Sequence, residues 1–175
     1  MIAVETLRAA IRDVPDFPKP GIVFKDITPV LSDPALFRAA IRLFVEQCEG
    51  KGITRVAGID ARGFLFGATI AHEMGVGFVP IRKKGKLPYA TVSHAYALEY
   101  GEAEIEVHTD AVSPGDRVTL VDDLLATGGT AHASVRLLEG LGAVVVQAQF
   151  LVELGFLPGR QALEPTPTLS ILRYE

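Results

Sequence analysis

Two adjacent aspartates and a glycine pair flanked by threonines follow one apolar run of this sequence. The run 118–121 leads directly into Asp122 and Asp123, and the stretch ATGGT occupies residues 126–130. An apolar run predicts a buried strand, and open α/β sheets bind ligands at the carboxyl ends of their strands. Glycines let backbone N–H groups converge on an anion, and a helix N-terminus adds further N–H donors. The residues expected to hold a phosphate monoester are Ala126, Thr127, Gly128, Gly129 and Thr130.

The aspartate pair would lie beside that phosphate. Carboxylates accept hydrogen bonds from the vicinal hydroxyls of a sugar, and Mg²⁺ prefers oxygen ligands while it keeps several waters. We therefore expect Asp122 and Asp123 to bind a ribose and to lie near a hydrated Mg²⁺, without a fixed set of direct protein ligands. The alternative is a plain strand–turn–helix connection whose aspartates only cap the surface. Each half of the segment is common, but both halves in one contiguous unit favour the ligand site.

The composition indicates an ordinary globular chain and argues against several classes of protein. The 175 residues, of which 49% are hydrophobic and 22% charged, suit one compact domain. A net charge of −4 argues against a general nucleic-acid binder, which needs a broad basic face. The single cysteine, Cys48, allows no internal disulfide. Because neither a signal peptide nor an apolar run of membrane length is visible, we expect a soluble, cytoplasmic protein without a membrane partner.

Helical and strand periodicities alternate after residue 33, as is typical of α/β domains. Asp33 and Pro34 predict a helix start, and the apolar stripe that follows reaches Cys48. Further helices are predicted over 64–74 and 130–141, and strands over 55–60, 78–81, 118–121, 143–152 and 169–172. We expect a short helix and an extended arm over residues 1–32. A loop is predicted over 83–95, and a hairpin is predicted with its arms over 97–101 and 104–107. The expected architecture is a central, mostly parallel sheet flanked by helices.

The segment VDDLLATGGT, residues 121–130, resembles the phosphoribosyl pyrophosphate signature of the type I phosphoribosyltransferases, in the form of their adenine-specific branch. Further segments match that branch in order: FPKPGIVFKDI at 17–27, ARGFLFG at 61–67, RKKGKLP at 82–88 and LEYG at 98–101. The resemblance spans nearly the whole chain. It implies that family's fold as a single domain over 1–175, with a small hood over 1–32, a flexible lid loop over 83–95 and a homodimer.

The resemblance also implies a reaction and its site residues. Adenine would combine with 5-phosphoribosyl 1-pyrophosphate, with Mg²⁺ as cofactor, to give AMP and pyrophosphate in purine salvage. The residues that the family's motifs place against pyrophosphate are Ala61, Arg62, Arg82, Lys83 and Lys86. Those placed around the base are Val23, Phe24, Lys25 and Leu124. Phe24 would stack on the purine, while the backbone of the hood would distinguish the amino group of adenine from the oxo group of hypoxanthine.

Other interpretations of these residues and of the whole chain stay open at this point. Arg62 would otherwise be an exposed surface arginine, and Phe24 a core residue. Spacing alone gives only a phosphoribosyl pyrophosphate site, so the base could also be hypoxanthine, xanthine, orotate or uracil. A non-catalytic regulator that senses this ligand would need an added nucleic-acid-binding segment, for which the first 32 residues are too short and insufficiently basic. Neither the G-x-G-x-x-G nor the P-loop pattern occurs.

Glu99 is expected to carry the proton that adenine loses, because the resemblance places it near the purine ring nitrogens. The substitution Glu99→Gln should lower turnover about 10²–10⁴-fold, the usual contribution of a general acid or base. Binding of phosphoribosyl pyrophosphate should stay nearly intact, since its phosphate and ribose contacts lie elsewhere in the sequence. Pyrophosphate release and calorimetric titration measure the two effects. A variant that turns over as fast as the parent would remove this role from Glu99.

Overall fold

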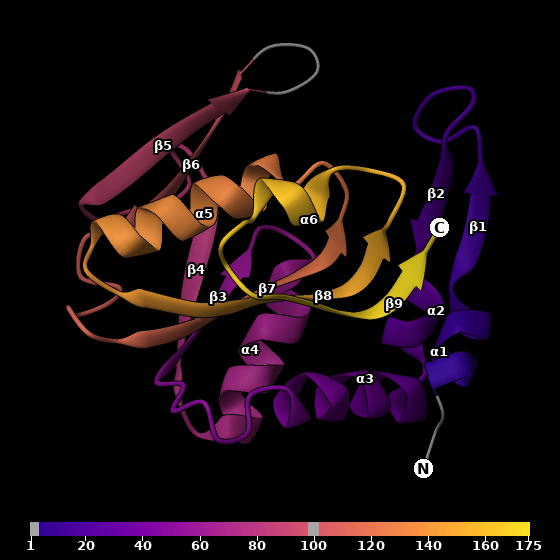
Figure 1. Ribbon diagram of the computed structural model, residues 1–175, viewed down its shortest axis with the longest axis horizontal. Coiled ribbons are helices and arrows are strands. Elements are labelled where there is room, and N and C mark those ends of the chain that lie inside the picture. The colour runs from indigo at the N-terminus through magenta and orange to yellow at the C-terminus, as the bar shows by residue number, and fades with distance from the viewer. Residues whose placement is uncertain (1–3, 98–101) are drawn as a thin grey trace.

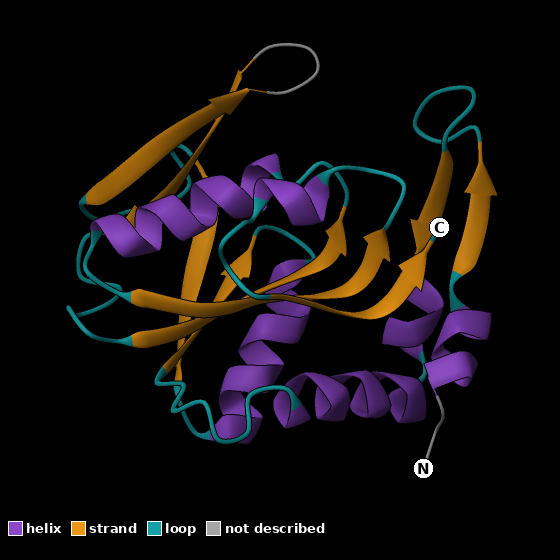
Figure 2. Ribbon diagram, viewed as in Figure 1, coloured by secondary structure: helices purple, strands orange, loops and turns teal. Residues whose placement is uncertain are grey.

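The protein folds around one large sheet that helices cover on both faces (Figure 1). The computed structural model describes residues 4–97 and 102–175. The helices are α1 (Val4–Ala10), α2 (Thr28–Ser32), α3 (Pro34–Glu46), α4 (Gly63–Met74), α5 (Gly129–Gly140) and α6 (Gly159–Ala162). The strands are β1 (Arg12–Pro15), β2 (Val23–Asp26), β3 (Arg55–Ile59), β4 (Gly77–Lys83), β5 (Thr91–Ala97), β6 (Glu102–His108), β7 (Arg117–Leu125), β8 (Val144–Leu154) and β9 (Thr168–Tyr174). Helices α5 and α6 lie on one face, and α3 and α4 on the other (Figure 2).

The large sheet is mixed and mostly parallel, which confirms the expected fold class. Across the described residues its strand order is β5-β6-β4-β3-β7-β8-β9. Strand β3 pairs in parallel with β4 and β7, and β8 pairs in parallel with β7 and β9. The hairpin β5–β6 joins antiparallel beside β4. Because parallel strands end at the same edge of a sheet, the segments that follow β3 and β7 meet there, and both contain predicted site residues.

Apolar side chains are buried on both faces of this sheet. In β7, Leu120 packs with the core beneath α5, whereas Val121 packs with the core formed by α3 and α4. In that second core the ring centroids of Phe44 and Phe66 lie 5.6 Å apart. Burial on both faces explains why the strand predicted over 118–121 ends in two consecutive apolar residues rather than in an alternating pattern.

The start of α3 is confirmed, but its end lies earlier than the apolar stripe indicates. The side chain of Asp33 accepts hydrogen bonds from the backbone N–H groups of Ala35 and Leu36 at 2.8 and 3.0 Å. The helix ends at Glu46, and Cys48 lies buried in the turn that follows. The stripe continues past the helix because the turn also packs against the sheet. Within 4–97 and 102–175, none of the helices is long and apolar enough to cross a membrane.

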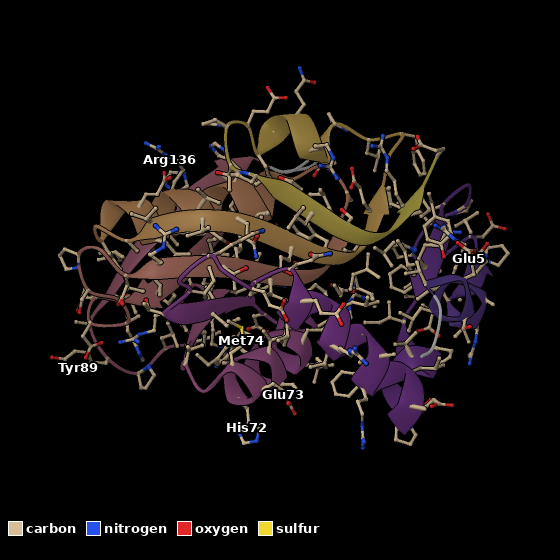
Figure 3. The ribbon with its side chains drawn as sticks, turned by 60° about the horizontal axis from the view of Figure 1, so that its bottom comes forward. Glu5, His72, Glu73, Met74, Tyr89 and Arg136 are labelled. Carbon is tan, nitrogen blue, oxygen red and sulfur yellow. The ribbon has the colours of Figure 1, made fainter. Side chains whose placement is uncertain are left out.

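The prediction of a loop over 83–95 is wrong for its second half. Residues from Thr91 onward form β5, which pairs with β6 along its whole length. The first arm of the hairpin is therefore Thr91–Ala97 and not 97–101, and residues 98–101 lie outside the described part of the chain. The sequence concealed β5 because it is an edge strand with several exposed side chains, so its alternation is weak. In the preceding connection, Tyr89 is exposed at the outer edge of the molecule (Figure 3).

The first 32 residues are more regular than a short helix and an extended arm. Helix α1 leads into β1, which forms an antiparallel two-stranded sheet with β2, and α2 follows. Among the described residues β2 pairs only with β1, so its outer edge is open. Figure 1 shows this hairpin at the β9 end of the large sheet, opposite the β5–β6 hairpin. The single domain over 1–175, with its hood and lid, stays a prediction.

Removing the cap of α3 tests the confirmed helix start. The substitution Asp33→Ala should lower the free energy of unfolding by about 0.5–2 kcal/mol, because two N–H groups lose their acceptor. Asp33→Asn is the matched control, since its amide oxygen can still cap the helix. Urea denaturation at neutral pH measures both variants. Equal loss of stability in the two would show that the lost charge, and not the lost cap, is responsible.

Candidate active site

The loop between β7 and α5 surrounds a cavity of about 100 Å³. All the residues predicted to hold a phosphate line it, namely Ala126, Thr127, Gly128, Gly129 and Thr130. Gly128 is the N-cap of α5 and has a φ of 84°, in the left-handed region that favours glycine. The first N–H groups of a helix have no partner within the helix, and the positive end of its dipole lies with them. The cavity therefore suits a small anion such as a phosphate monoester.

Helix α6 packs so closely beneath this loop that only glycine fits at the contact. A Cβ atom on Gly159 would lie 2.3 Å from the carbonyl oxygen of Ala126, and one on Gly128 would lie 2.7 Å from the carbonyl oxygen of Gly159. The buried carboxylate of Glu153 accepts two hydrogen bonds from Arg160 of α6, at 2.9 and 2.5 Å. Those bonds hold the pKa of Glu153 below its usual value despite its burial. Sequence reasoning missed this support, because no local motif marks it.

The two aspartates near the carboxyl end of β7 have different surroundings. Asp123 is buried, and its Oδ2 lies 2.6 Å from Nε of Arg62. Asp122 accepts the backbone N–H of Asp123 at 2.9 Å. Burial, together with the neighbouring charge of Asp123, raises the pKa of Asp122 well above its usual value. Gly63 permits this packing, because a Cβ atom there would lie 2.8 Å from Oδ1 of Asp122.

Arg62 also reaches the N-terminal hairpin. Its guanidinium carbon lies 5.3 Å from the ring centroid of Phe24, while its Nε contacts Asp123. The Phe24 ring meets Phe17 edge-on at 5.2 Å between centroids. An aromatic ring in this position can stack on a planar base, and the open edge of β2 can offer backbone N–H and C=O groups to the polar edge of that base.

The other residues predicted to bind the base lie in different places. Val23 is exposed on β2, and Leu124 lines the phosphate cavity. The side chain of Lys25 is already engaged, since its Nζ lies 2.6 Å from a carboxylate oxygen of Asp13 and 4.1 Å from the ring centroid of Tyr174. The expected contact between Lys25 and the base therefore depends on its backbone.

Arg82 lies near the end of β4, beside the end of β3. Its Nε donates to Asp60 at 3.1 Å, and its Nη1 donates to the carbonyl oxygen of Lys86 at 3.0 Å. Arg62 thus follows the end of β3, and Arg82 lies near the end of the neighbouring strand β4. Guanidinium groups at these positions can bind a diphosphate in a bidentate manner. The remaining predicted pyrophosphate residues, all exposed, are Ala61, Lys83 and Lys86.

Glu106 is a further residue that sequence reasoning did not single out. Although it is only 4% exposed, its carboxylate accepts the backbone N–H groups of Lys86 and Leu87 at 2.9 and 2.8 Å. Burial alone would raise the pKa of Glu106. The backbone hydrogen bonds from Leu87, Gly85 and Lys86 outweigh the effect of burial, so the pKa of Glu106 lies below its usual value. Glu106 therefore fixes the backbone of the basic connection between β4 and β5. The sequence placed Glu106 only in the second arm of the predicted hairpin, over 104–107.

The aspartate pair has the right chemistry for Mg²⁺, which takes carboxylate oxygens and water as ligands. Among residues 4–97 and 102–175, no group of three or more His, Cys, Asp or Glu side chains converges on one point. Asp122 and Asp123 would therefore hold the ion together with water or a bound anion. Glu99, the predicted proton carrier, lies outside the described residues, and its role stays a prediction.

Comparison with known proteins identifies relatives over nearly the full length of the chain. Residues 27–155 match the model of the phosphoribosyl transferase domain. The adenine phosphoribosyltransferase of Methylococcus capsulatus is 58% identical over 98% of this chain and all of that relative. The crystal structure of adenine phosphoribosyltransferase from Thermoanaerobacter pseudethanolicus superposes with a TM-score of 0.96 at 50% identity, covering 98% of this chain and 100% of that one.

The solved structure of a more distant relative contains bound small molecules. The adenine phosphoribosyltransferase of Trypanosoma brucei was solved with AMP, pyrophosphate and ribose-5-phosphate. It is 30% identical to this chain, with a TM-score of 0.88, and the match covers 97% of this chain and 79% of that one. The expected fold is thus shared across a wide range of sequence identity.

Replacing Glu106 tests whether its carboxylate orders the basic connection. Because the pKa of Glu106 is lowered by folding, its stabilising effect is present above its unfolded pKa and is lost as the pH falls through its lower folded value. Glu106→Gln should lower the free energy of unfolding at pH 7 by about 1–2 kcal/mol and flatten its fall below about pH 4.5. Glu139→Gln, on the exposed face of α5, is the control. Urea unfolding across pH 3–7 measures this, and an unchanged acid limb would contradict it.

Proposed function

The chain belongs to the type I phosphoribosyltransferase family, and from this membership we propose that it transfers the phosphoribosyl group of 5-phosphoribosyl 1-pyrophosphate to adenine. The products are AMP and pyrophosphate. The observation that carries the proposal within the molecule is the placement of Arg62, which contacts Asp123 and lies over Phe24. Sugar, pyrophosphate and base subsites are therefore within reach of one side chain.

The cavity at the N-terminus of α5 holds the 5′-phosphate, and the aspartate pair accepts hydrogen bonds from the ribose hydroxyls. As the bond from C1 of the ribose to pyrophosphate breaks, positive charge develops on the sugar, and water must be kept away from it. Arg62 has five N–H donors, so it can keep its contact with Asp123 and also donate to the leaving pyrophosphate. Arg82, Lys83 and Lys86 supply further positive charge to that group.

A bound Mg²⁺ ion near Asp122 and Asp123 would neutralise part of the pyrophosphate charge. The base stacks on Phe24, with Leu124 on the side of the β7 loop. Backbone groups of Val23 and Lys25 on the open edge of β2 hydrogen-bond to the purine edge. A base that leaves one of these groups unpaired is disfavoured by about 1–3 kcal/mol per group. Glu99 takes up the proton from adenine.

The family resemblance also supports a homodimer that works in the cytoplasm as part of purine salvage. Size-exclusion chromatography with light scattering measures the oligomeric state directly. A monomer that turns over at full rate would contradict the homodimer without affecting the proposed reaction.

Pyrophosphate release with each free base tests the proposed reaction. We expect rapid release with adenine, at least about 10-fold less with hypoxanthine or guanine, in line with one unpaired polar group, and none without Mg²⁺. Release with another base alone would keep the phosphate site but overturn the assignment of the hood to adenine. No release with any base, despite measurable binding of phosphoribosyl pyrophosphate, would favour the non-catalytic regulator.

A further inference from the structure

The β5–β6 hairpin contacts the phosphate loop, residues 126–130, through a hydrogen bond between two hydroxyl groups. The hydroxyl oxygen of Tyr96, in β5, lies 2.9 Å from Oγ1 of Thr130, in the first turn of α5. Thr130 lines the cavity that receives the phosphate, and the Tyr96 ring packs against the core beneath α5. The ring thus anchors the tyrosine while its hydroxyl reaches the rim of the cavity.

We propose that Tyr96 is a positioning residue of the 5′-phosphate site and acts through Thr130; this inference rests on the proposed function. A threonine hydroxyl has one O–H donor and two acceptor lone pairs. The phenolic hydroxyl of tyrosine can likewise both donate and accept a hydrogen bond. When Thr130 donates its proton to a phosphate oxygen, Tyr96 donates its own proton to the freed side of Thr130. The result is a chain of hydrogen bonds from Tyr96 through Thr130 to the phosphate.

This chain of hydrogen bonds fixes the side chain of Thr130 in the orientation that a phosphate requires. Without the Tyr96 hydroxyl, the hydroxyl of Thr130 can rotate toward solvent or toward a backbone carbonyl, and ligand binding must restrict it again. Hydrogen bonds in a chain polarise one another, which further strengthens the contact with the anion. The effect is confined to the phosphate end of the substrate, because Thr130 lines the phosphate cavity while the β1–β2 hairpin stands at the opposite end of the large sheet from β5 (Figure 1).

The test uses Tyr96→Phe, which keeps the ring in the core and removes only the hydroxyl. Calorimetric titration with ribose 5-phosphate should show affinity lowered about 2- to 10-fold, the loss of one neutral hydrogen bond. In steady-state assays the KM for phosphoribosyl pyrophosphate should rise by a similar factor, while the KM for adenine stays unchanged. A general structural defect would affect both constants.

A double-mutant cycle with Thr130→Val decides whether Tyr96 acts through Thr130. In the Thr130→Val background, adding Tyr96→Phe should change the affinity for ribose 5-phosphate by less than about 1.5-fold, because the chain is already broken. An undiminished effect there, or parental affinity in Tyr96→Phe alone, would overturn the proposal. Ser134→Ala is the control, since the Ser134 hydroxyl bonds to the carbonyl of Thr130 and not to its hydroxyl. Ribose 5-phosphate binding without pyrophosphate release would contradict the proposed reaction and leave this inference testable.

Discussion

The ion pair between Arg62 and Asp123 joins the ends of two neighbouring strands and organises the site around itself. Its 2.6 Å contact needs the start of α4 to approach β7 closely, which Gly63 allows. Asp123 is buried, and its contact with the guanidinium offsets the hydration that the carboxylate loses. The exposed part of Arg62 remains free to face Phe24 and an anionic ligand. One side chain therefore links the large sheet, the aspartate pair and the β1–β2 hairpin.

The candidate site combines a closely packed loop with two projecting hairpins. The phosphate loop is held between α5 and α6, where the contact of Gly128 with Gly159 leaves no room for a side chain. The β1–β2 and β5–β6 hairpins stand at opposite ends of the large sheet, with α5 between them (Figure 1). Arg62 links the first hairpin to β7 through Phe24 and Asp123, and Tyr96 links the second hairpin to the start of α5 through Thr130.

Local sequence patterns predicted much of the central sheet and the residues that line the cavity before α5. The helix after Asp33, the core strands and the turn before α5 all have strong local signals, namely caps, apolar runs and glycines. Strand β5 has no such local signal, because its extended conformation depends on its hydrogen bonds to β6 rather than on a pattern in its own residues. Glu106 was missed for a related reason: its carboxylate is buried by a connection that folds back over it.

The family of this protein can be read from its residues alone: two carboxylates before a glycine turn, the segment over 17–27 and a basic cluster occur in the order of one family. These features depend on residue types at short spacing, which the chain carries in any conformation. Which side chains contact one another, by contrast, depends on the fold. Arg62 with Asp123 and Phe24, Tyr96 with Thr130, and Lys25 with Asp13 are pairs from different elements. Their contacts arise from strand order and packing, which no local pattern encodes.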